Sequence, residues 1–145
     1  MQGIKRKIVY VGLYEGFAIV AATLGLAGMS GQGMQAAGWM AVAASVVAVV
    51  WNLVFNTLFE RWEARQAVRG RSVVRRVVHA VAFEAGLVVF LVPLMAWWFT
   101  TTLLQALVMD LGLVVFFVGY TFVFNWAFDR VFGLPTAAIG AAVAV

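Results

Sequence analysis

The chain contains four long apolar runs, and these constrain its fold more than any other feature. They cover residues 8–29, 36–59, 77–99 and 103–128. About 20 apolar residues in a helix are enough to cross a bilayer, and isolated strands cannot satisfy their backbone hydrogen bonds in lipid. The sequence therefore predicts an all-α integral membrane protein with four transmembrane helices.

The composition agrees with this prediction and excludes several classes of function. Hydrophobic residues make up 65% of the chain and charged residues only 11%, whereas a soluble domain carries about 25% charged residues. The chain has no cysteine and one histidine, His79, which excludes thiol chemistry and multi-ligand Cys or His metal sites. The sequence shows no phosphate-binding loop and no nucleophile with its base. We expect a protein that is not an enzyme and that carries no metal and no cofactor.

The basic residues gather outside the apolar runs and predict the orientation of the chain. They are Lys5, Arg6 and Lys7 before the first run, Arg61, Arg65, Arg69, Arg71, Arg75 and Arg76 around the middle connection, and Arg130 after the fourth run. Lysine and arginine favour the cytoplasmic side of a membrane. We therefore expect both termini in the cytoplasm and the short connections at 30–35 and 100–102 outside. The orientation of the chain in the membrane then explains the net charge of +4. Because the basic residues are accounted for in this way, we expect no nucleic acid partner.

The two halves of the chain repeat each other at a single offset of 69 residues. The offset superposes Lys7 on Arg76, Tyr10 on His79, Tyr14 on Phe83, Glu15 on Glu84, Trp51 on Tyr120, Asn52 on Thr121, Phe55 on Phe124, Asn56 on Asn125, Phe59 on Phe128 and Glu60 on Asp129. The chain is thus predicted to be a tandem repeat of two parallel helical hairpins, residues 1–69 and 70–145, related by a pseudo-two-fold axis along the membrane normal. Because the first run has a counterpart, we expect it to be a span and not a cleaved signal peptide. Asp110 breaks the symmetry, since it maps to Ala41.

Polar residues inside the apolar runs point to a binding site. An ionisable residue at mid-helix costs about 2.5–3.5 kcal/mol on insertion scales, and Glu15 and Glu84 both lie about seven residues into a run. With a helical period, each hairpin has one polar and aromatic face, and we expect the four faces to converge on one shared interior open to the cytoplasm. The candidate substrate-binding residues are Glu15, Tyr14, Asn52, Phe55, Asn56, Glu84, Tyr120 and Asn125.

Such an interior suits a proton or a lipophilic cation. A desolvated carboxylate exchanges protons closer to neutral pH, and aromatic faces attract organic cations. The structural alternative is that Glu15 pairs with Lys7 or Arg76 and that the amides only link helices. Four further residues are candidates for either a proton relay or a structural role: His79, Asp110, Glu60 and Asp129. We expect Glu60 and Asp129 to help close the inner ends of the hairpins.

Gly12 and Gly16 form a GxxxG pair on the first helix. Such pairs let helices approach closely, so we expect this face to meet either a neighbouring helix or a partner subunit. A homodimer is compatible with the sequence, which leaves the oligomeric state open.

Three long motifs resemble the proteobacterial antimicrobial compound efflux family, whose best-known member exports chlorhexidine. They are Arg76-x-x-His79-Ala80-x-x-Phe83-Glu84, Trp51-Asn52-x-x-Phe55-Asn56-x-x-Phe59-Glu60 and Tyr120-Thr121-x-x-Phe124-Asn125-Trp126-x-Phe128-Asp129. The first motif of the chain departs from the family, because Lys7 and Tyr10 stand where the family has Arg and His, while Glu15 is kept. The resemblance covers all four runs.

The resemblance implies a multi-pass transporter of the bacterial inner membrane. It would export cationic amphipathic molecules, such as biocides, dyes or short-chain diamines, in exchange for protons, with Glu15 as the proton-coupling residue. The alternative from another class is a non-transporting assembly or structural protein that uses its polar residues only for helix packing.

Overall fold

The computed structural model of the protein describes residues 3–67 and 72–133, and these form four helices. Their bounds are α1 Gly3–Ser30, α2 Met34–Ala64, α3 Val73–Trp98 and α4 Leu103–Phe132. Each helix is long and apolar enough to cross a membrane, and the described residues contain no strand. The predicted all-α membrane fold is confirmed. Arg69 and Arg71 of the expected cytoplasmic connection lie outside the described residues.

The helix ends follow from local chemistry. Gly31, with φ of 68°, ends α1 because glycine adopts a left-handed backbone without steric cost. Ser72 and Thr102 cap α3 and α4, since their hydroxyls accept hydrogen bonds from the backbone NH groups of Arg75 and Gln105. The Ser72 cap lies ahead of the third apolar run, so α3 begins at Val73, four residues before the run at residue 77. The first helix also begins before its run, at Gly3. Glu15 and Glu84 therefore lie near the middle of their helices and not close to one end.

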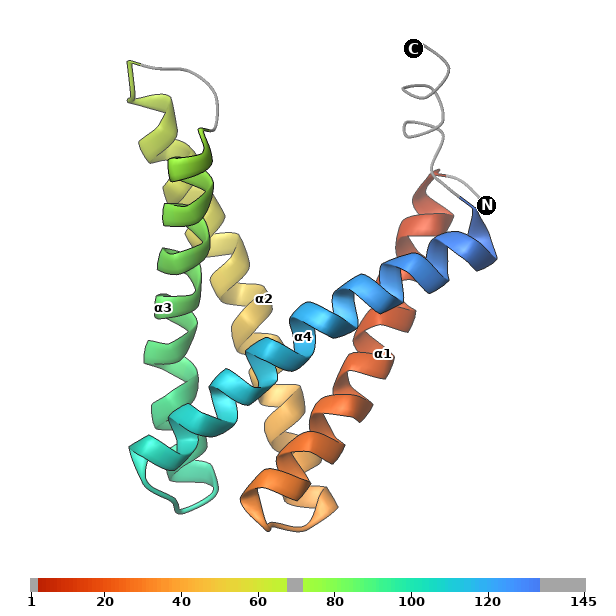
Figure 1. Ribbon diagram of the computed structural model, residues 1–145, viewed down its shortest axis with the longest axis vertical. Helices are drawn as coiled ribbons and strands as arrows, with labels where there is room; N and C mark the ends of the chain where they lie inside the picture. The colour runs from red at the N-terminus through yellow and green to blue at the C-terminus, as the bar shows by residue number, and fades with distance from the viewer. Residues whose placement is uncertain (1–2, 68–71, 134–145) are drawn as a thin grey trace.

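The helices pack in a closed cycle. α1 contacts α2 and α4, and α3 contacts α2 and α4. Figure 1 shows that α4 starts beside α3 and crosses to the first turns of α1. The two short connections lie together at one end of the molecule, which we call the short-loop end, whereas the start of α1 and the end of α2 lie at the opposite end.

The hydrophobic core lies at the short-loop end. Leu26, Met40 and Met95 are fully buried there, one from each of the first three helices. Ala106, Met109 and Leu113 bring the start of α4 into the same cluster. Away from this core the helices separate into two pairs, α1 with α4 and α2 with α3 (Figure 1). The molecule is therefore held together at one end and divided at the other.

The glycine pair of α1 does not bring another helix of the chain close. A Cβ atom added at Gly12 or at Gly16 would have no neighbour within 4 Å. The expectation of tight packing against a neighbouring helix is therefore wrong for the described residues, because α1 contacts α4 and α2 through other side chains, such as Tyr10 and Glu15. The other expectation, contact with a second subunit, stays a prediction.

The close approach of α2 to α3 depends on a different glycine. The Trp51 ring lies directly over Gly86, where an added Cβ would come within 2.1 Å of the ring atom Cζ2. The same indole donates a hydrogen bond from Nε1 to the carbonyl oxygen of Phe83, at 3.0 Å. Any side chain at position 86 would displace the indole and break this bond.

We predict that Gly86→Ala destabilises the protein by about 1–3 kcal/mol, the usual cost of overpacking a tight contact. Gly119→Ala on α4 is the matched control, since nothing lies within 4 Å of a Cβ added there. Thermal unfolding followed by circular dichroism in detergent compares the two variants. Equal unfolding midpoints would show that the contact of Trp51 with Gly86 does not constrain the fold.

Candidate substrate-binding and proton-coupling site

The interface between α1 and α4 is held by tyrosine hydroxyls, and we call it the tyrosine interface. The Tyr10 hydroxyl donates to Oδ1 of Asn125 at 2.6 Å, and the Tyr120 hydroxyl donates to the carbonyl oxygen of Tyr14 at 2.8 Å. The Tyr14 hydroxyl is hydrogen-bonded to Oγ1 of Thr121 at 2.8 Å. Each of these polar groups therefore has a partner on the facing helix, as burial in lipid requires.

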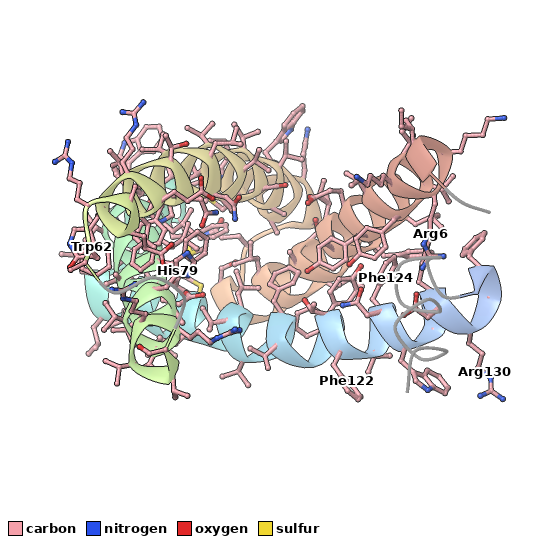
Figure 2. The ribbon with its side chains drawn as sticks, turned by 90° about the horizontal axis from the view of Figure 1, so that it is seen from above. Arg6, Trp62, His79, Phe122, Phe124 and Arg130 are labelled. Carbon is pink, nitrogen blue, oxygen red and sulfur yellow. The ribbon has the colours of Figure 1, made fainter. Side chains whose placement is uncertain are left out.

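Aromatic rings fill the rest of the tyrosine interface. The Tyr10 ring meets Phe124 and Phe128 edge-on, with centroids 5.5 and 5.1 Å apart. The Tyr14 ring lies 5.1 Å from that of Tyr120 and 5.2 Å from that of Phe124. Figure 2 shows Phe124 directed between the two helices, whereas Phe122 points away from them. The interface thus presents several ring faces around a few hydroxyl and amide groups.

The interface between α2 and α3 contains the only histidine, and we call it the histidine interface. His79 Nε2 lies 2.9 Å from Oδ1 of Asn56, and Nδ2 of Asn56 donates to Oδ1 of Asn52 at 3.2 Å. The rings of Phe55 and Phe59 lie 5.0 and 4.7 Å from the imidazole. With the Trp51 bond described above, this interface also combines aromatic packing with hydrogen bonds across the helix pair.

Two hydrogen bonds of the tyrosine interface have equivalents in the histidine interface under the 69-residue repeat. Tyr10 with Asn125 corresponds to His79 with Asn56. The bond from Tyr120 to the Tyr14 carbonyl likewise corresponds to the bond from Trp51 to the Phe83 carbonyl. In both cases the polar face of a helix meets a helix of the other hairpin. The repeat predicted which residues are equivalent, but not that they pair across hairpins.

The expected single shared interior is therefore not what the contacts form. Tyr14, Tyr120 and Asn125 belong to the tyrosine interface, and Asn52, Phe55 and Asn56 to the histidine interface, so the candidate set is divided. Figure 2 shows the two groups on opposite sides, with His79 between α2 and α3 and Phe124 between α4 and α1. The physical reason is that the hydrogen bonds of each interface are satisfied within one helix pair.

Glu15 lies beside the tyrosine interface and reaches toward a third helix. Its Oε2 accepts a hydrogen bond from Oγ of Ser45 on α2, at 2.8 Å. Within the described residues it forms no ion pair with Lys7 or Arg76. One neutral hydroxyl donor leaves the charge of this carboxylate without a fixed counter-ion.

Glu84 lies on α3 and Asp110 on α4, two helices that contact each other. Asp110 is 2% exposed, and its Oδ2 has no hydrogen-bond partner among the described residues. The same is true of Oε2 of Glu84. Glu84, although equivalent to Glu15 in the repeat, therefore has a different environment.

Of the two acid groups near the helix ends, Asp129 takes a structural position. Asp129 accepts a hydrogen bond from the Arg6 guanidinium at 2.6 Å, and Arg6 lies over the Phe128 ring with its Cζ 4.9 Å from the centroid. Arg6 also donates to the carbonyl oxygen of Gly133 at 2.5 Å. Asp129 therefore ties α4 to α1 of the other hairpin, and not to α3 of its own. Glu60 is exposed on α2.

Sequence reasoning missed two residues that complete these contacts. Ser45 is the one polar residue between residues 36 and 50, and a lone hydroxyl in an apolar run is a signal for a buried hydrogen bond. Arg6 stands among three consecutive basic residues, which predict orientation but do not distinguish the one that forms an ion pair. Only the crossing of α4 over α1 selects Arg6.

These observations define a multi-pass helical membrane protein that holds carboxylates, amides and aromatic rings within its membrane-length helices. The sequence model of one protein family, described as chlorhexidine efflux transporter, matches residues 2–65 and again 71–134. The chain belongs to this family. The starts of the two matches differ by 69 residues (71 minus 2), the same offset as the repeat, which supports the tandem hairpin organisation.

Curated relatives agree with the family. The chain is 33% identical over 127 residues to a short-chain diamines transporter of Acinetobacter baumannii, covering 88% of each chain. It is 32% identical over 127 residues to a short-chain diamines transporter of Acinetobacter baylyi, covering 88% of this chain and 89% of the relative. A protein of the same description from Vibrio parahaemolyticus is 33% identical over 125 residues, covering 86% of this chain and 89% of the relative. No solved structure matches the chain. The family and these relatives are transporters and not enzymes.

We predict that Arg6 and Asp129 are energetically coupled by about 0.2–1 kcal/mol, the range measured for solvent-accessible ion pairs. A double-mutant cycle measures this coupling: the unfolding free energy is determined for Arg6→Ala, for Asp129→Asn and for the combined variant. Arg6→Ala alone should cost more than Asp129→Asn, because Arg6 also binds the carbonyl of Gly133. Lys5→Ala is the control and should have no effect; strictly additive effects in the cycle would contradict the ion pair.

Proposed function

We propose that this protein is a proton-coupled antiporter that exports organic cations from the cytoplasm across the bacterial inner membrane, with both termini on the cytoplasmic side. Its cargo would be short-chain diamines and cationic biocides or dyes, in line with the descriptions of the family and of the relatives. The single observation that carries the proposal is the mid-helix carboxylate of Glu15, which has a neutral donor, Ser45, and no fixed counter-ion.

Coupling in this proposal is competition for one carboxylate. Deprotonated Glu15 attracts either an ammonium group or a proton, and once one is bound the electrostatic attraction for the other is removed. A cation bound from the cytoplasm is therefore released outside when a proton reaches Glu15 there. The Ser45 hydroxyl can donate to the carboxylate in its free state and turn away when a cation replaces it, since a hydroxyl rotates freely.

The rings beside Glu15 supply the second half of the binding site. Tyr14 and Tyr120 lie 5.1 Å apart between ring centroids, and Tyr120 donates a hydrogen bond to the carbonyl oxygen of Tyr14, the residue directly before Glu15. A cation on Glu15 would therefore meet tyrosine ring faces, which attract alkylammonium groups and aromatic biocides alike. The Asn125 amide would orient the bound cation. Such a site tolerates cargo of different shape because ring faces are not directional.

The moving bodies in this proposal are the two helix pairs, α1 with α4 and α2 with α3. Hydrogen bonds and rings link the two helices of each pair, whereas the pairs are joined by the apolar core at the short-loop end and by the hydrogen bond from Ser45 to Glu15. Rocking about that core would open and close the space beside Glu15. Asn52, Phe55 and Asn56 would then line the facing pair, with Glu84 as a further candidate for the second ammonium of a diamine.

A homodimer is part of the proposal. Gly12 and Gly16 are exposed on α1 and have open space before them. This face of small residues would let α1 of a second subunit approach closely, and rocking could then occur between subunits as well.

We predict that Glu15→Gln abolishes substrate-driven proton movement in proteoliposomes, because an amide cannot exchange a proton for a cation. Proton movement is followed with a pH-sensitive dye inside the vesicles after addition of a diamine or chlorhexidine. Glu60→Gln, which neutralises an exposed acid on α2, is the matched control and should retain transport. Unchanged antiport in Glu15→Gln would remove the basis of the proposal.

We also predict that a dicationic ligand quenches the tryptophan fluorescence of the protein in a saturable manner, with weaker binding at acid pH. The reason is that protons compete with the ligand for Glu15. A fluorescence titration at several pH values measures this, with Glu15→Gln as the control that should lose the pH dependence. A non-transporting membrane protein would give no saturable, pH-sensitive signal.

A further inference from the structure

The hydrogen bond between Ser45 and Glu15 joins the two helix pairs to each other. The Ser45 hydroxyl on α2 donates to Oε2 of Glu15 on α1 at 2.8 Å, and both side chains are half-buried. The tyrosine bonds described above stay within one pair, as with Tyr10 and Asn125 between α1 and α4. A polar contact that crosses between the pairs restricts any motion of one pair against the other.

This bond lies at the edge of the apolar core, where the two pairs begin to separate. Ser45 stands about one helical turn beyond Ala41, a core residue of α2, and Glu15 about two turns before Ala22, a core residue of α1. Figure 1 shows α1 and α2 diverging from the short-loop end toward their other ends. If the pairs rotate away from each other about the core, the bond must lengthen or break.

The strength of the bond depends on what is bound to Glu15. A hydroxyl that donates to an ionised carboxylate forms a charge-assisted bond, which is about twice as strong as a bond between neutral groups. A proton on Glu15 removes the charge and with it this extra strength. An ammonium group brings donors of its own, which compete with the hydroxyl for the carboxylate oxygens. The bond is therefore strongest when Glu15 is ionised and carries no cargo.

The other titratable and charged groups of the packed helices have different partners or lie further away. Tyr120 on α4 donates to the Tyr14 carbonyl, and Asp129 accepts from Arg6. On α2, the first such residue after Ser45 is about four turns away. The remaining groups on α2, α3 and α4 are Glu60, Arg61 and Glu63, then Arg75, Arg76, His79 and Glu84, and finally Asp110 in the core and Arg130 over the Trp126 ring. The occupancy of Glu15 itself therefore sets the strength of this bond.

We propose that Ser45 is a positioning residue that holds the two helix pairs together while Glu15 is ionised and unloaded, and so prevents the unloaded protein from rocking. Tight exchange requires this property. A carrier that rocked without cargo after releasing its proton would collect another proton on the other side and leak protons down their gradient. The inference rests on the proposed antiport and names the residue that keeps the exchange coupled.

The first test measures proton leak in proteoliposomes of the full-length protein, under an imposed pH gradient and without cargo. We expect Ser45→Ala to raise the leak about tenfold, because loss of a hydrogen bond to a charged group shifts an equilibrium by about that factor. Ser45→Thr keeps a hydroxyl and should restore the low leak. Thr57→Ala is the matched control on α2 and should change nothing, since its hydroxyl bonds to the Leu53 carbonyl of the same helix.

The leak must also pass through Glu15. The double variant Ser45→Ala with Glu15→Gln should therefore lose it. A leak that persists in the double variant would mean that removing the hydroxyl only damages the packing, and would overturn the inference. Vesicles with Ser45→Ala that are as tight as those with the unaltered protein would overturn it as well.

The second test measures the separation of the helix pairs without using transport. Because the chain has no cysteine, spin labels can be placed on Ile8→Cys in α1 and Leu58→Cys in α2, two exposed positions toward the ends that diverge. Pulsed electron paramagnetic resonance in lipid then gives the distance between them, and dilution with unlabelled protein removes signals between subunits. At alkaline pH without cargo we expect one narrow distribution. Ser45→Ala, or addition of putrescine, should broaden it toward longer distances.

The two tests separate this inference from the proposed function. Identical distance distributions in the unaltered and Ser45→Ala proteins would overturn the inference even if antiport is observed. A distribution that depends on Ser45 in a protein that shows no antiport would support the bond between the pairs and reject the proposed function alone.

Discussion

The structure depends on one constraint, which is that a polar side chain in lipid must find its partner inside the protein. The chain meets it with hydrogen bonds between α1 and α4 and between α2 and α3, as with Tyr10 on Asn125 and His79 on Asn56. These bonds leave the backbone of each helix intact, since they use side chains and the spare lone pair of a carbonyl oxygen. The two helix pairs follow from this requirement, and the apolar core then only has to join them at one end.

The same constraint explains why the acids differ in role. Asp129 has a cation, Arg6, and so contributes to packing. Glu15 has only the hydroxyl of Ser45, and Asp110 has an oxygen with no donor among the described residues. Charge without a counter-ion is costly in a membrane, which is why we assign proton and cation binding to an acid that lacks one, Glu15.

Much of the fold could be predicted from the sequence, because hydrophobic length and basic flanks act locally. The apolar runs predicted the four helices. The cap at Ser72 places the start of α3 ahead of its apolar run, and the cap at Thr102 fixes the start of α4 at its run. The repeat gave the equivalence of Tyr10 with His79. The helix that each polar face packs against could not be predicted, since the sequence pattern of the face is the same whether it meets its own hairpin or the other one. The role of Ser45 depends on that arrangement and was hidden for the same reason.

The crossed pairing has a consequence for the origin of the chain. A single hairpin would leave the hydroxyl of a residue like Tyr10 and the amide of one like Asn125 facing lipid, because each needs the helix of another hairpin. A two-helix ancestor would therefore have been stable only as an association of two copies in the same orientation. Fusion of such copies would make that association permanent, and it would also free one half to carry an acid such as Asp110, which a symmetric pair of identical hairpins would have to carry twice.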